Sequence, residues 1–186
     1  MNRFCLLLII GIFCVSSSVP AWSEQAPKSV VDLANTTLAT FGASPEIVSA
    51  VKAQNKMKKS LADIQAMDER WKATPGIAPF MKELMDSDCG VFLRQLQDSA
   101  PYYAEIFVMD NQGANVAMTD KTSDYWQGDE AKFKRSFNSG QGQIFVDEVE
   151  FDESSQVYVV QVSVPVMDGD RAIGAITFGI DVDQIQ

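Results

Sequence analysis

The sequence contains no histidine among its 186 residues. Without an imidazole, the Ser-His and Cys-His nucleophile pairs and the usual zinc ligands are excluded. No phosphate-binding loop is present, and residues 140–143 (GQGQ) lack the strand before and the helix after that a dinucleotide fingerprint requires. Acidic pairs suited to glycoside hydrolysis always exist in such a chain, but nothing singles one pair out. We therefore predict a protein that is not an enzyme, with no catalytic residues, no metal ligands and no cofactor.

Cysteine and basic residues are scarce. Cys5, Cys14 and Cys89 are the only cysteines, and 15 Lys and Arg stand against 25 Asp and Glu, for a net charge of −10. A chain this acidic, with no basic stripe, is not suited to bind nucleic acid or an anionic membrane. Cys89 is expected to be a small buried apolar residue, with an intermolecular disulfide as the alternative.

Long apolar runs are also rare, and the one at residues 4–15 is too short for a membrane span of about 20 residues. Arg3 precedes the run and small residues follow it, as in a secretory signal. We expect residues 1–23 to be a signal peptide that is cut after Ala21 or Ser23, which leaves a soluble periplasmic protein. A retained N-terminal anchor is the alternative.

Helical patterns dominate the first half of the remaining chain. Residues 24–43 form a transition segment with weak helical periodicity, and residues 45–73 are predicted to form one long helix that is capped by Ser44. Apolar residues recur along this helix at spacings of three and four, with polar interruptions at Gln54 and Asp68. Packing on a domain is the favoured interpretation, and pairing with a second copy is the alternative.

Strand patterns follow two short helices at residues 77–88 and 90–100 that are broken at Cys89 and Gly90. Two strands at 102–110 and 114–120 are joined by a tight turn, and three more are expected at 142–151, 156–166 and 171–182. A short helix at 129–137, with Phe133 and Phe137 stacked one turn apart, lies between the second strand and the third. We predict an α+β fold with a long N-terminal helix on one face of a five-stranded antiparallel sheet and this insertion on the other.

Two stretches, MDNQGANVAMTD and VSVPVMDGDRAIGAITFGIDV, resemble a known family. Together with the order of elements, they are similar to the Cache domain, the PAS-like extracytoplasmic sensor domain of bacterial chemoreceptors and histidine kinases. The resemblance covers roughly residues 44–183 and implies one Cache-like domain at 44–186. Family members generally continue into a transmembrane helix and an output module. This sequence stops at Gln186, so we expect a free-standing periplasmic Cache protein.

The resemblance implies a ligand pocket under the loop between the second and third strands. Tyr125 and Trp126 fall in this loop beside Asp124, and Lys121 is the only base nearby. Aromatic side chains can line a pocket while their polar atoms fix a ligand, and they can equally plug a loop onto a sheet as core. Both interpretations remain open from the sequence.

Polar residues within the predicted strands are further candidates. Gln161 and Ser163 share one side of the 156–166 strand, and Thr177 interrupts the last strand. They are predicted to bind ligand if they face the loop, and to contact solvent if they face outward. Asp147 approximates the position at which amino-acid-binding relatives place an acid for the ligand ammonium. Those relatives also carry an Arg and a Pro-Trp pair near the loop, which this sequence lacks.

The resulting functional prediction is a periplasmic sensor, not an enzyme, that takes part in chemotaxis-like signal transduction. It would bind a small organic ligand of the amino acid, carboxylate or amine class and signal through a membrane-bound receptor or kinase, with a homodimer left open. The alternative is a secreted protein–protein adaptor or regulator with a vestigial pocket that dimerises through the 45–73 helix.

Overall fold

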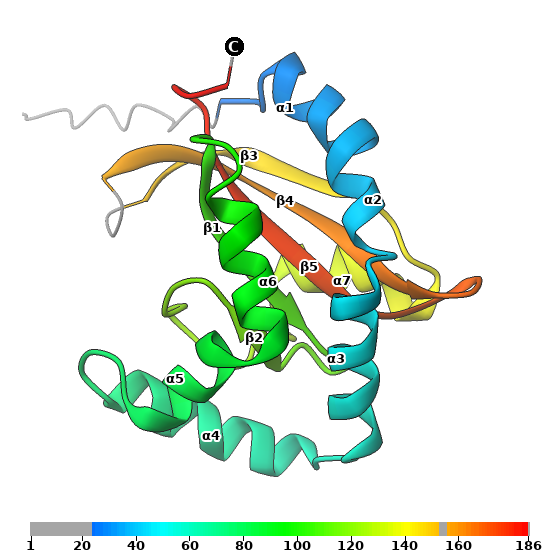
Figure 1. Ribbon diagram of the computed structural model, residues 1–186, viewed down its shortest axis with the longest axis vertical. Coiled ribbons are helices and arrows are strands. Elements are labelled where there is room, and N and C mark those ends of the chain that lie inside the picture. The colour runs from blue at the N-terminus through cyan, green and yellow to red at the C-terminus, as the bar shows by residue number, and fades with distance from the viewer. Residues whose placement is uncertain (1–23, 153–155, 186) are drawn as a thin grey trace, which may run out of the picture.

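A five-stranded antiparallel sheet with the strand order β2-β1-β5-β4-β3 forms the centre of the molecule (Figure 1). The computed structural model describes residues 24–152 and 156–185, so the predicted signal peptide at residues 1–23 lies outside the described residues. The strands are β1 Tyr103–Met109, β2 Asn115–Met118, β3 Phe145–Asp152, β4 Val157–Asp168 and β5 Arg171–Asp181. The predicted α+β fold is confirmed.

In the described residues, seven α-helices and two helical turns of other types surround this sheet. They are α1 Lys28–Leu33, the π-helical turn η1 Ala34–Leu38, α2 Ala39–Phe41, α3 Pro45–Lys56, α4 Leu61–Ala73, α5 Pro79–Asp86, α6 Asp88–Gln97, α7 Ala131–Phe137 and the 3-10 turn η2 Asn138–Gly140. Within the described residues, no helix combines the length and the apolar character needed to cross a bilayer.

The predicted continuous helix at 45–73 is wrong, because the chain breaks between α3 and α4. Lys58 adopts a positive φ of 51°, and α4 then turns away from the direction of α3 (Figure 1). The break has a local cause, since the side chain of Ser60 accepts a hydrogen bond from the backbone N–H of Asp63 and caps a new helix. Met57, which the periodicity placed in the apolar seam, is 64% exposed at the break.

The transition segment is more regular than its sequence indicated. Helical turns run from Lys28 to Phe41, and Val30, Ala34 and Leu38 are fully buried along one side of them. This spacing of four residues is the apolar stripe of a helix that packs on a sheet. At its N-terminal end, Glu24 forms an isolated antiparallel bridge with Val149 of the edge strand β3.

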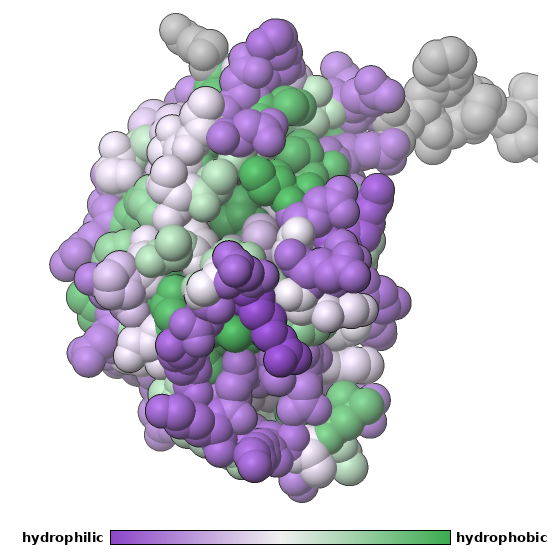
Figure 2. Space-filling model, turned by 90° about the vertical axis from the view of Figure 1, so that its right-hand side faces the viewer, coloured by the Kyte–Doolittle hydropathy of each residue, from purple (hydrophilic) through white to green (hydrophobic). Residues whose placement is uncertain are grey.

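One face of the sheet, here called the helix-covered face, lies under α1–α3 and α6 and is closed by apolar side chains. Its β4 residues Val160, Val162, Val164 and Val166 are all fully buried, and its β5 residues include Ile176 and Phe178. Figure 2 views the molecule from the side on which α1–α3 lie, and hydrophilic residues border a hydrophobic area there. The main core therefore lies between this face and the N-terminal helices.

The opposite face, here called the insertion face, is covered by α7 and by the loop that precedes it. Phe133 and Phe137 of α7 stack with ring centroids 5.2 Å apart, as their spacing in the predicted short helix indicated. A second core joins Phe107 and Met109 of β1 to Phe133 and to residues of α4 and α5. The cover is incomplete, because α7 packs over β3, β4 and β5 at one end of the sheet and leaves the other end open.

Candidate functional site

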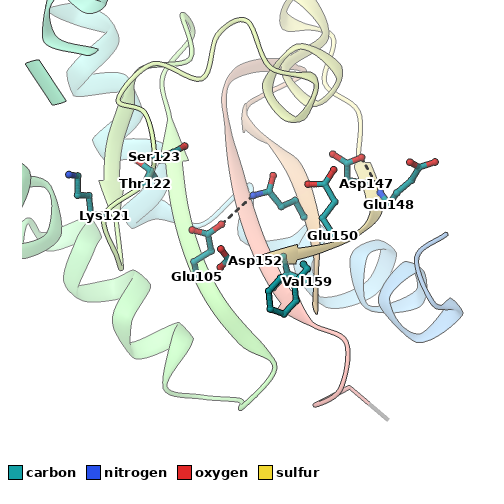
Figure 3. A pocket seen from close by; sticks show the side chains of 11 residues that line it. Glu105, Lys121, Thr122, Ser123, Asp147, Glu148, Glu150, Asp152 and Val159 are labelled. Carbon is teal, nitrogen blue, oxygen red and sulfur yellow. Dashed lines mark hydrogen bonds between the residues drawn. The ribbon is translucent and has the colours of Figure 1, made fainter. Parts of the chain in front are cut away.

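An open cleft of about 510 Å³ lies at the uncovered end of the insertion face (Figure 3). Strands β1, β3 and β4 and the loop segment 121–123 supply its walls. It is lined by Glu105, Lys121, Thr122, Ser123, Asp147, Glu148, Glu150, Phe151, Asp152, Val159 and Gln161. Its volume lies within the range of roughly 300–1,000 Å³ that small-molecule sites occupy.

Negative charge dominates the cleft. Five of the lining side chains are carboxylic acids and one, Lys121, is a base. Figure 3 shows Asp152 of β3 beside Glu105 of β1, with Asp147, Glu148 and Glu150 farther along β3. The Lys121 ammonium donates a hydrogen bond to the backbone carbonyl of Thr74 at 2.7 Å. A concave surface with charges of one sign focuses its potential and raises the local concentration of cations.

Glu105 lies partly buried on β1, and the sheet sets its position. Glu105 alternates in phase with Phe107 and Met109 along β1, so its side chain faces the insertion face with theirs. Gly179 of β5 lies opposite, and a Cβ atom at Gly179 would come within 2.7 Å of the Glu105 Cγ atom. Glycine at this position therefore leaves the space that the glutamate occupies.

The surroundings of Glu105 favour its protonated form. Burial raises the pKa of Glu105, Lys132 opposes this shift, and Asp152 adds to it. Gln161 donates a hydrogen bond from Nε2 to the Glu105 carboxylate at 3.3 Å. A cation bound in the cleft would favour the ionised form of Glu105.

Three of the residues proposed from the sequence meet in this cleft. Lys121, Asp147 and Gln161 all line it, although they come from the loop, β3 and β4 respectively. Gln161 of β4 therefore faces the insertion side of the sheet. The Asp147 carboxylate also accepts the backbone N–H of Glu148 at 3.0 Å, at the irregularity in β3 between Val146 and Val149.

Ser163 and Thr177 lie on the same face but not in the cleft. Their hydroxyl groups hydrogen-bond to each other at 2.7 Å, and both side chains are fully buried. Ser163 of β4 pairs with Thr177 of β5. The next residue pair on this face, in the direction of the cleft, is Gln161 with Gly179. Because each hydroxyl already has a partner, the pair contributes to the core beneath α7.

Tyr125 packs as core. The residue is 4% exposed, and its ring lies 5.6 Å from the Trp71 ring of α4. Its hydroxyl accepts a hydrogen bond from Lys59 Nζ at 3.3 Å, and burial raises the pKa of Tyr125. The Tyr125 side chain therefore packs in the second core and holds its loop against it, and Tyr125 does not line the cleft.

Trp126 and Asp124 lie on the other side of the same loop. They line a separate hollow of about 430 Å³ together with Gln65, Asp68, Glu69, Lys72, Asp129 and Glu130. The indole Nε1 of Trp126 donates to the carbonyl of Gln112 at 2.8 Å, which fixes the ring against the β1–β2 turn. Residues 125–127 also pair with 113–115 through backbone hydrogen bonds, so this part of the loop is extended and its neighbouring side chains point apart.

Sequence reasoning missed most of the carboxylates of the cleft. Glu105 had a signal, because it alternates in phase with Phe107 and Met109 and so had to face the same side as two buried residues. Glu150 and Asp152 gave none, since β3 is an edge strand whose exposed acids look like ordinary solvated residues. In the described part of the chain, no three His, Cys, Asp or Glu side chains lie close enough together to hold a metal ion.

Comparison with known proteins gives matches only among solved structures. No family model matches the chain, and no curated protein sequence matches it. The sensor domain of the Vibrio cholerae histidine kinase DctB is 15% identical with a TM-score of 0.45, and the match covers 85% of this chain and 52% of that one. The ligand-binding domain of the Campylobacter jejuni chemoreceptor Tlp3, in complex with 4-methylisoleucine, is 14% identical with a TM-score of 0.43.

The Tlp3 match covers 86% of this chain and 61% of that chain, so the sequence spans between half and two thirds of the length of these two domains. The matched proteins are a sensor domain of a histidine kinase and a ligand-binding domain of a chemoreceptor, which is the class that the sequence resembles.

Proposed function

We propose that this chain is a sensor domain of the Cache type, not an enzyme, and that it binds a small organic cation of the amine class in the acidic cleft. The observation that supports this most directly is the composition of the cleft, with five carboxylic acids and one lysine around about 510 Å³. An ammonium group gains favourable interactions with these acids, whereas a carboxylate ligand would add a like charge to them. Of the three predicted ligand classes, the acids of the cleft favour amines, and amino acids that bind through their ammonium group.

Glu105 and Gln161 are proposed to contact the ligand at the base of the cleft. Their own hydrogen bond is long at 3.3 Å, and Glu105 is partly buried beside the open space. An arriving ammonium group would replace the lost hydration of the carboxylate with a direct charge-assisted hydrogen bond. Phe151 and Val159 supply apolar surface for the hydrocarbon part of the ligand.

Export and signalling complete the proposal. The apolar run at residues 4–15 supports a periplasmic location, and the sequence resemblance to Cache domains supports a membrane-bound receptor or kinase as the signalling partner.

A matched pair of ligands tests the proposal. 1,4-Diaminobutane and succinate have four carbons each and opposite charges, and a ligand that binds the folded state alone raises the melting temperature. We expect the diamine to raise it and succinate to leave it unchanged, with the effect reduced by Glu105→Gln. Glu83→Gln on α5 removes the same charge outside the cleft and serves as the control. Equal responses to the two ligands, or an equal loss in both variants, would exclude the cleft as an amine site.

The adaptor alternative is supported by a different observation. The space beneath the loop, where the resemblance implied a pocket, is filled by Tyr125, Phe107 and Phe133 in the second core. The interface that was predicted for this alternative needs revision, because the 45–73 helix is two helices. A silent panel of amines, amino acids and carboxylates together with a dimer in sedimentation equilibrium would favour the adaptor over the sensor.

A further inference from the structure

The carboxylate of Asp68 on α4 joins this helix to the loop beside the cleft. Asp68 is 4% exposed, and its Oδ1 atom accepts the backbone N–H groups of both Tyr125 and Trp126, at 2.8 and 3.0 Å. Its Oδ2 atom pairs with Lys72 at 2.7 Å, and this hydrogen bond is the main reason why the pKa of Lys72 is raised. The buried Asp68 carboxylate hydrogen-bonds to this loop and pairs with Lys72, so it connects α4 specifically to the loop.

The end of α4 also holds the part of the loop that lines the cleft. Trp71 donates from Nε1 to the carbonyl of Thr122 at 2.8 Å, and Lys121 donates to the carbonyl of Thr74 at 2.7 Å. Lys121 and Thr122 form the wall of the cleft that faces β3 and β4. One wall of the cleft is thus attached to α4 at two points, and Asp68 secures the residues that follow.

Apart from its bonds to the loop, α4 is held by a few contacts in the second core and by Phe80 of α5, whose ring lies 6.0 Å from that of Trp71. Ile64, Asp68 and Trp71 are its only buried residues, and two of these three bond directly to the loop. The helix is preceded by the break at residues 57–60, where Lys58 has a positive φ and Met57 is exposed. A segment with few buried contacts opens more readily than the sheet, so α4 and the loop are suited to move as one unit.

We propose that Asp68 is a positioning residue of the cleft and that it couples α4 to the loop wall, so that occupancy of the cleft changes the mobility of α4. This rests on the proposed function of the cleft as a ligand site. The coupling is reciprocal, because an interaction that holds the wall for a ligand also lets the ligand hold α4. The sequence presented Asp68 as a polar interruption of an apolar seam, and the hydrogen bonds to the loop explain its presence there.

Hydrogen exchange of the whole chain, measured without ligand, tests the coupling. In Asp68→Ala we expect residues 121–127 and 61–73 to exchange faster together by about tenfold or more, which corresponds to the loss of one charge-assisted hydrogen bond. Strands β4 and β5 should keep their protection. Asp68→Asn retains an amide oxygen in the same place and should restore most of the protection.

Glu69→Ala is the matched control, since Glu69 is one residue away, pairs with the same lysine at 3.4 Å and makes no recorded bond to the loop. It should change neither segment. Trp71→Phe keeps a ring but removes the N–H donor to Thr122, and it should loosen both segments to a smaller extent. Faster exchange of the loop with α4 unchanged, an equal effect in Glu69→Ala, or a uniform rise that includes the sheet would each overturn the proposal.

A second arm adds 1,4-diaminobutane to the wild-type chain. We expect slower exchange in residues 61–73 of the wild type. In Asp68→Ala we expect a weaker affinity by about tenfold at an equal folded fraction, and Asp68→Asn should recover most of that loss. If the diamine binds without protecting α4, the coupling is wrong and the cleft stands as a binding site. If the diamine does not bind at all, the proposed function of the cleft fails, while the ligand-free exchange still decides whether Asp68 joins the loop to α4.

Discussion

The two faces of the sheet differ in how completely they are closed, and strand β4 contributes to both. On the helix-covered face, four valines at alternate positions of β4 are all fully buried. On the insertion face, the β4 residues of the other parity include Val159, Gln161 and Ser163, of which the first two line an open cleft. One strand therefore supplies a dry core on one side and a polar site on the other.

The difference shows where stability and function are separated in this molecule. Apolar burial is not directional, so the helix-covered face needs only side chains of suitable volume. The insertion face depends on particular hydrogen bonds, such as those of Ser163 to Thr177 and of Asp68 to the loop. Truncations on the first face should thus give the largest losses of stability, whereas the effects of substitutions on the second should depend on which hydrogen bond or charge is removed.

Truncation in the helix-covered core should give the largest loss of stability. Phe178 is fully buried between β5 and the N-terminal helices and lies 5.8 Å from the Phe41 ring. We expect Phe178→Ala to lower the free energy of unfolding by about 3–5 kcal/mol, from lost burial and an unfilled cavity. Urea denaturation measures the change. Phe151→Ala removes the same side chain at a 47% exposed position and should cost far less; a comparable loss in both would contradict the contrast between closed and open regions.

Breaking the buried hydroxyl pair should have the next largest effect. Thr177→Val removes one hydroxyl and leaves the Ser163 hydroxyl buried without its partner, which costs about 1–3 kcal/mol. The double variant Ser163→Ala with Thr177→Val removes both polar groups and should recover much of that loss. A double variant that loses the sum of the two single effects would show that the pair is not coupled in this way.

Neutralising Glu105 should produce a smaller change that depends on pH. Because the folded state raises the pKa of Glu105 above its ordinary value of 4.5, the folded state holds the proton more tightly than the unfolded state. Stability therefore falls as the pH rises from 4.5 through the folded pKa. We expect Glu105→Gln to raise the unfolding midpoint at pH 7 and to have no effect below pH 4.5, where the acid is protonated in both states.

The same ionisation should govern ligand binding. Affinity for 1,4-diaminobutane should increase as the pH rises through the folded pKa of Glu105, because the carboxylate gains its charge, and this increase should be absent in Glu105→Gln. Isothermal titration at several pH values measures it. An unchanged pH profile in the variant would show that Glu105 does not contact the amine.

The smallest effect is expected at the exposed aromatic pair beside the cleft. Tyr158 is 52% exposed and packs edge-on against Phe151, with 5.2 Å between ring centroids. Tyr158→Ser should change the free energy of unfolding by no more than about 1 kcal/mol, since the pair buries little surface. A larger loss in thermal unfolding would mean that this end of the sheet supports the core.

Local patterns in the sequence were sufficient for much of the fold. Alternation predicted the five strands, the Asp110–Gly113 turn followed from its composition, and the spacing of Phe133 and Phe137 predicted a helix with stacked rings. The sequence also brought Lys121, Asp147 and Gln161 forward as site residues, and they do line one cleft. The predictions of strands, turn and helix hold because they depend on neighbours within a few residues, whereas the role of these three residues in ligand binding stays a prediction.

Periodicity misled where a local signal competed with it. The apolar seam continued from α3 into α4, but the cap formed by Ser60 and Asp63 started a new helix. Gln54 and Asp68 looked like defects of the seam. In the structure, Gln54 donates to the Asp110 carboxylate at 2.9 Å and Asp68 accepts from the loop, so both polar residues hold distant segments in place.

The sequence by itself determined which residues form strands and which side of each strand is apolar, since both follow from backbone geometry and a period of two. Only the tertiary structure decided which polar residues meet. Glu105 of β1, Gln161 of β4 and Asp152 of β3 lie far apart in the chain, and the register of three strand pairs brings them to one cleft. The loop that closes its wall is placed by Asp68 and Trp71 on a helix more than fifty residues earlier. Such contacts depend on long-range packing that no local pattern records.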